Sequence, residues 1–111
     1  ISSRPGITPD IQRIMLAEPL LELPGAARTI IAFRTHAEEE FGVAIPVQGV
    51  PLYTDARHYA SAGIPTVLYG AGPKTLQEAN GHGADECLRL DDLRKATAVV
   101  ALTLVDLLRG N

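Results

Sequence analysis

The sequence predicts an α/β fold in which helices are layered on a small parallel or mixed sheet. Three observations support this prediction. Residues 26–41 and 91–108 have apolar positions at helical spacing, and residues 65–69 have the β-branched and aromatic content of a buried strand. Helical and extended segments that alternate along a chain typically form a sheet covered by helices.

The chain divides into two regions at the strong turn signal Pro24-Gly25. Residues 1–24 are a turn-rich lead-in, and residues 25–111 form the main region. Within the lead-in, Thr8 and Pro9 can begin a short helix. The apolar face of that helix would be Ile11, Ile14 and Met15.

Residues 26–41 form the first helix of the main region, and Gly42 offers a left-handed end to it. The apolar positions at spacings of three and four are Ile30, Phe33, Ala37 and Phe41. Residues 43–47 then alternate as a strand does, although Pro46 lacks an N–H and restricts that strand to an edge or a bulge.

Thr54 can cap a second helix that ends at Gly63, directly before the predicted strand 65–69. A loop with room for one helical turn at residues 75–79 follows, and residues 87–90 suit a short strand. The last helix is capped by Asp91, and its middle is apolar on nearly every side, so it needs to be covered.

Composition excludes some classes of function. The net charge is −3 and the ten Lys and Arg residues are scattered, which gives no basic surface for nucleic acid or an anionic membrane. No run approaches the roughly 18 apolar residues that span a bilayer. Cys87 is the single cysteine, so no intrachain disulfide can form, and we expect a cytoplasmic location.

Arg57 is a candidate ligand contact, because its planar guanidinium suits a carboxylate and α/β sheets bind ligands beyond the ends of their strands. Its neighbours Thr54 and Asp55 have two interpretations. They can serve only to cap a helix and complement its dipole, or they can belong to the same ligand site.

His82 is a candidate metal ligand, since Gly81 and Gly83 leave its ring unobstructed and Asp85 or Glu86 can fix its tautomer. The alternative is an ordinary surface histidine. One imidazole supplies one bond, whereas a catalytic zinc needs about three protein ligands. His36 and the glutamates at residues 38–40 are interpreted instead as a solvated, charge-rich helix face.

An ordered series of motifs resembles one known family. The series is Tyr53-Thr54-Asp55-Ala56-Arg57, then Gly63-Ile64-Pro65-Thr66-Val67, Gly70, His82 with Glu86, and Asp92-Leu93. It resembles the C-terminal part of the zinc metallopeptidases that include acetylornithine deacetylase, succinyl-diaminopimelate desuccinylase, aminoacylase and glutamate carboxypeptidase.

The resemblance implies a two-zinc hydrolase that cleaves an amide bond of a small acylated amino acid or peptide. Its α/β catalytic domain, of the zinc-exopeptidase type, is interrupted by a lid domain that usually dimerises. Residues 1–24 would be the end of the lid, and residues 25–111 the last part of the catalytic domain. By this resemblance His82 matches the last metal ligand and Glu86 its supporting carboxylate. Tyr53, Thr54 and Arg57 would lie in the segment that contacts substrate.

The resemblance also implies what this chain lacks, because the other metal ligands and the catalytic glutamate belong to the family's N-terminal half. We therefore expect no catalytic residue here, an inactive isolated chain, and zinc that is absent or weakly bound. Unpaired strands and a poorly covered last helix predict a homo-oligomer. The alternative is a stand-alone, non-catalytic α/β binding or interaction module.

Overall fold

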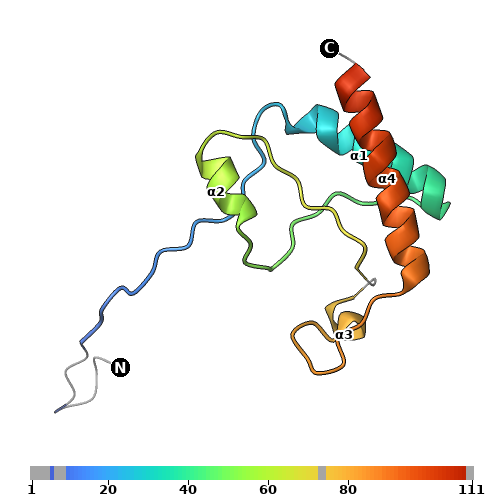
Figure 1. Ribbon diagram of the computed structural model, residues 1–111. Helices are drawn as coiled ribbons and strands as arrows, with labels where there is room; N and C mark the ends of the chain where they lie inside the picture. Colours follow the sequence, from blue (N-terminus) through green and yellow to red (C-terminus); the bar gives the residue numbers. More distant parts are fainter. Residues whose placement is uncertain (1–5, 7–9, 73–74, 110–111) are drawn as a thin grey trace.

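Four helices form the regular structure of the described part of the protein. A computed structural model describes residue 6, residues 10–72 and residues 75–109 (Figure 1). The helices, in chain order, are α1 (Ala26–Phe41), α2 (Ala56–Ser61), α3 (Leu76–Ala79) and α4 (Leu90–Arg109).

The predicted α/β fold is wrong for the described part of the chain, which contains helices and no strand. The segments expected as strands, residues 43–47, 65–69 and 87–90, are irregular or extended. A strand needs a neighbour to receive its main-chain hydrogen bonds. No main-chain hydrogen bond joins these three segments among the described residues. The N–H of Ile45 is instead bound by the Glu38 carboxylate at 3.1 Å. Apolar, β-branched content was therefore not sufficient to form a sheet.

The short helix expected near the N-terminus is also absent from the residues described there. Thr8 and Pro9 lie outside the described residues, and residues 10–23 are irregular. The first part of this segment extends away from the helices as an arm (Figure 1). The side chain of Ile14 is 97% exposed, so the predicted apolar face has nothing to pack against. Without such packing a single short turn of helix is not stable.

The prediction for residues 26–41 is confirmed by α1. The helix follows Gly25, whose φ is 101°, and it is terminated by Gly42 at φ 67°. The N–H of Gly42 donates to the carbonyl of Glu38 at 2.9 Å. Glycine suits both positions because it lacks the Cβ that penalises left-handed backbone.

The core lies where α1 crosses α4 (Figure 1). It is made of small side chains, which let the two helices approach closely. Its fully buried residues are Ala26, Ala37, Ala96, Val99 and Thr103. The helix α4 begins one residue before the predicted cap, so Asp91 lies in its first turn. There a hydrogen bond from Arg94 and the charge of Lys95 hold the Asp91 pKa below its usual value.

The protein has an open shape. Its radius of gyration is 19.3 Å, against about 13 Å for a compact chain of this length. Its accessible surface is 9154 Å², whereas a compact protein of 11.8 kDa exposes about 5,900 Å². Many large apolar side chains are therefore exposed. No helix in the described ranges is long and apolar enough to cross a membrane.

Candidate functional site

The loop that bears His82 is held in shape by its own backbone and by Glu86. The φ angles of Asn80 and His82 are 49° and 64°, so both residues are in the left-handed region. The N–H of Gly83 donates to the carbonyl of Asn80 at 2.8 Å. The carboxylate of Glu86 accepts a hydrogen bond from the main-chain N–H of His82 at 2.9 Å. Glu86 therefore closes the loop through the backbone, and His82 is exposed.

The donor groups around His82 do not fit a complete zinc site. Within the described residues, no group of three or more His, Cys, Asp or Glu side chains is close enough to hold a metal ion. A catalytic zinc requires about three protein ligands and an open position. Within the described part of the chain, this loop could supply the imidazole of His82 as one ligand of such a site.

The segment Tyr53–Arg57 leads into the first turn of α2. Thr54 Oγ1 accepts a hydrogen bond from the N–H of Ala56 at 3.1 Å, which satisfies a free donor of the first turn. The guanidinium carbon of Arg57 lies 4.4 Å from the centre of the Tyr53 ring, an arrangement in which the cation is attracted to the aromatic face. The Arg57 Nε is buried, with no hydrogen-bond partner in the described structure.

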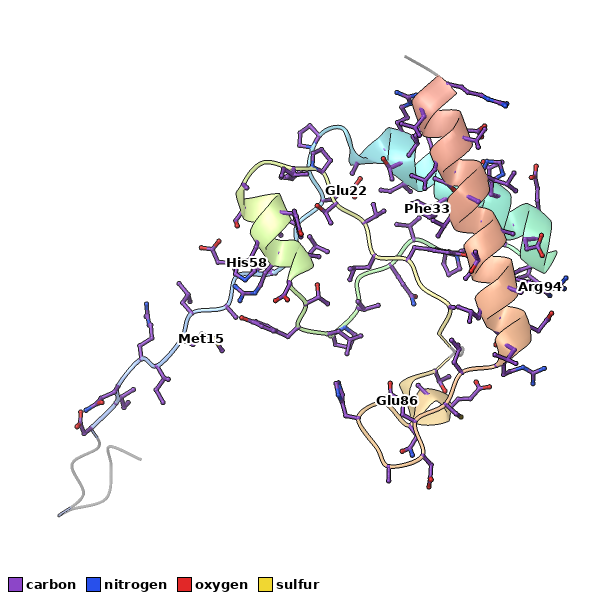
Figure 2. The ribbon with its side chains drawn as sticks, in the orientation of Figure 1. Met15, Glu22, Phe33, His58, Glu86 and Arg94 are labelled. Atoms are coloured by element: carbon purple, nitrogen blue, oxygen red, sulfur yellow. The ribbon has the colours of Figure 1, made fainter. Side chains whose placement is uncertain are left out.

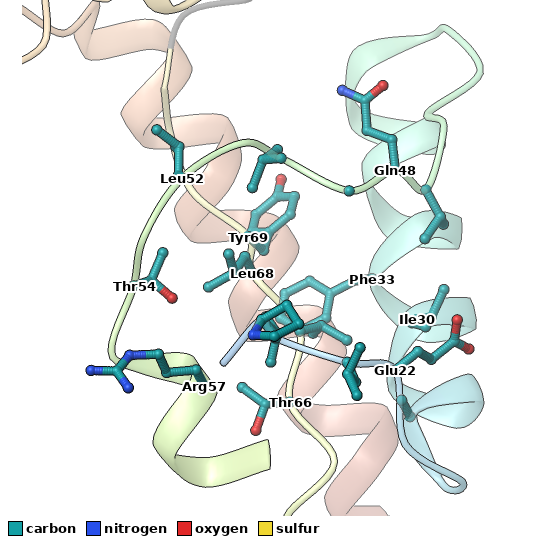
Figure 3. Close-up of a pocket in the computed structure, with 18 of the residues that line it drawn as sticks. Glu22, Ile30, Phe33, Gln48, Leu52, Thr54, Arg57, Thr66, Leu68 and Tyr69 are labelled. Atoms are coloured by element: carbon teal, nitrogen blue, oxygen red, sulfur yellow. The ribbon is translucent and has the colours of Figure 1, made fainter. Parts of the chain in front are cut away.

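Tyr53, Thr54 and Arg57 line one cleft of about 690 Å³ (Figure 3). Its walls come from α1, from Arg57 in the first turn of α2, and from three irregular segments, residues 17–22, 45–54 and 66–69. Figure 3 shows Arg57 and Thr54 on one side and Phe33 and Ile30 on the other. The cleft thus combines the guanidinium groups of Arg34 and Arg57 and the carboxylates of Glu18 and Glu22 with a largely apolar lining.

Two aromatic side chains lie against each other in the apolar lining of the cleft. The rings of Phe33 and Tyr69 stack with centroids 4.9 Å apart and an angle of 29° between their planes. Burial, with a smaller contribution from the charge of Glu40, raises the pKa of Tyr69 above its usual value. Phe33 was predicted on a helix and Tyr69 on a strand, but no signal in the sequence predicted that the two rings meet.

The structure brings together the three predicted substrate contacts and leaves the predicted metal ligand apart. Neither His82 nor Glu86 lines the cleft. Figure 2 shows Glu86 on the loop beyond α3, separated from Phe33 in the cleft wall. The roles of His82 and Glu86 remain predictions.

Comparison with known proteins identifies the class. The family model described as peptidase family M20/M25/M40 matches residues 11–106, and the chain belongs to this family. The expected resemblance is therefore confirmed at the level of the family, whose members are generally metal-dependent. No curated protein and no solved structure matches the chain. The subfamily stays a prediction.

Proposed function

We propose that this chain is the C-terminal part of the catalytic domain of a two-zinc hydrolase. The parent enzyme would cleave an amide bond of an N-acyl amino acid or a small peptide. The observation that supports this proposal best is the family match across residues 11–106. A second support is the cleft in which Tyr53, Thr54 and Arg57 lie together.

In this proposal Arg57 binds a substrate carboxylate. Its Nε is buried without a partner, so a carboxylate that reached it would satisfy a donor that is otherwise desolvated at a cost. Tyr53 holds the guanidinium in place through its ring, and Thr54 fixes the turn that presents both residues. The apolar wall at Phe33 and Leu68 would accept the substrate's side chain or acyl group.

His82 would contribute one metal ligand to the parent enzyme, and the remaining ligands and the general base would come from outside this chain. The isolated chain would then be inactive and would bind zinc weakly. The exposed single imidazole is consistent with this role, because a ligand that is completed by other segments must remain reachable.

We also propose that the isolated chain self-associates. Exposed apolar side chains are spread over α4 and over the extended segments, and large exposed apolar surfaces favour association. Light scattering across a wide range of concentrations tests this proposal, and a protein that stayed monomeric throughout would contradict it. The cytoplasmic location stays a prediction from the single Cys87.

The test of function uses the longer parent enzyme and the chain side by side. Zinc content and amide hydrolysis are measured for the parent, for His82→Asn, and for the control His58→Asn, which alters an exposed histidine on α2. Asparagine is chosen because it tolerates the left-handed backbone of residue 82. We expect His82→Asn to lose zinc and activity and the control to retain both.

Three results would contradict the proposal. Full activity of His82→Asn would remove the ring from the metal site. Amide hydrolysis by the 111-residue chain alone would show that the missing ligands are not required. A natural gene product that lacks any further metal ligands and hydrolyses no amide would favour the alternative, a non-catalytic binding module.

A further inference from the structure

A histidine and two carboxylates lie where α1 meets the last turns of α4. The Nε2 of His36 is 2.7 Å from Oδ2 of Asp106, which joins the two helices across 70 residues of sequence. The Nδ1 of the same ring is 3.6 Å from Oε2 of Glu39, one turn further along α1. The imidazole is 13% exposed, so it lies largely inside the helix contact rather than on the solvated face that the sequence suggested.

The two ring nitrogens have different needs. A neutral imidazole has one donor and one acceptor, and the short contact with Asp106 requires the proton on Nε2. The Nδ1 of a neutral ring would then be a bare acceptor that is buried without a hydrogen-bond partner and faces a carboxylate. A doubly protonated ring presents a donor to each carboxylate. The geometry therefore suits the charged form of His36.

The charges around the ring reinforce this preference. On α1, Glu39 faces Nδ1 and Glu40 shares the face of His36 four residues on. On α4, Asp106 faces Nε2. Among the cations of the two helices, Arg28 donates from its guanidinium to the Leu107 carbonyl at 3.0 Å, Arg34 is paired with Glu38 at 2.9 Å, and Arg109 lies in the last turn of α4. Acidic groups thus make the direct contacts with the ring.

The contact between α1 and α4 is sensitive to such a link because its apolar part is small. Its buried residues are three alanines, one valine and one threonine, so the helices gain little from apolar burial. The polar links from His36 and Arg28 both reach the C-terminal end of α4, where the last carbonyls have no partner within the helix.

We infer that His36, Asp106 and Glu39 form a proton-dependent clamp between α1 and α4. The clamp is strongest while the ring carries both protons, and it weakens as the pH rises and Nδ1 loses its proton. Imidazole is the side chain whose charge ordinarily changes between about pH 5 and pH 8. The clamp is independent of the cleft and of the proposed hydrolase activity.

The test is thermal unfolding of the 111-residue chain, followed by circular dichroism at about pH 5.5 and about pH 8.5, on either side of imidazole titration. We expect His36→Gln and Asp106→Asn each to lower Tm by roughly 4 °C or more at the lower pH and by distinctly less at the higher pH. His58→Gln is the matched control, because His58 is an exposed histidine on α2, and its effect should be small at both pH values.

A third variant, Glu39→Gln, keeps the ring and tests the second arm of the clamp. The amide it introduces can donate to a neutral Nδ1, so Tm should depend less on pH than in the unaltered chain. Nitrogen NMR of the His36 ring gives a second readout if His36→Gln does not fold. Equal losses at both pH values in Asp106→Asn, or a ring that stays singly protonated at about pH 5.5, would overturn the proposal.

Discussion

The contact between α1 and α4 gives a prediction whose size follows from burial. Val99 is 0% exposed, whereas Val100 on the same helix is 37% exposed. Val99→Ala removes two buried carbons, which costs about 1.6 kcal/mol in transfer free energy. The cavity adds about 1 kcal/mol. The better helix propensity of alanine returns about 0.5 kcal/mol. The expected net loss of unfolding free energy is therefore about 2 kcal/mol, or roughly 8 °C or more in Tm.

Val100→Ala is the matched control, since it makes the same chemical change at a site that is partly solvated. The gain in helix propensity offsets the smaller loss of burial, so its stability should change by less than about 0.5 kcal/mol. Thermal and urea unfolding of both variants measure the difference. Equal destabilisation of the two variants would refute the assignment of Val99 to the centre of the helix contact.

Three further predictions concern backbone and charge. The pKa of Glu38 lies below its ordinary value of 4.5 because Arg34, and to a smaller extent the N–H of Ile45, bind its carboxylate. The contribution of Glu38 to stability is therefore present above pH 4.5 and is lost as the pH falls through the lowered pKa. Glu38→Gln should make the stability depend less on pH in acid unfolding over this range. Gly25→Ala should lower Tm more than Gly42→Ala, because both residues have positive φ but only the new Cβ at residue 25 meets Pro65 Cγ, at 3.2 Å. The raised pKa of Tyr69 favours its protonated form in the folded state, so stability should fall as the pH rises above about 10, and Tyr69→Phe should remove that fall in alkaline unfolding curves.

The helices were predictable because their signals are local. Apolar spacing and Gly42 predicted the extent of α1, and the predicted turn at residues 75–79 contains α3. The start of α4 differed by one residue from the predicted cap, which is within ordinary variation at helix ends.

The sheet was not predictable because strands are stabilised by partners elsewhere in space. Residues 65–69 have the composition of a strand, yet within the described chain their main-chain groups find no ladder. The same limitation applies to the site. Motif order indicated Thr54 and Arg57, whereas the stacking of Phe33 on Tyr69 and the link from His36 to Asp106 depend on contacts between distant residues.

The extended segments on either side of α2 have a practical consequence. A protease binds its target as an extended strand. Residues 44–50 and 65–72 lie outside helices and have no ladder partner among the described residues, so they can enter an active-site cleft without unfolding a helix. A protease that prefers apolar side chains should cut there before it attacks α1 or α4. Early digestion products would then map which stretches of the chain become shielded when a larger assembly forms around them.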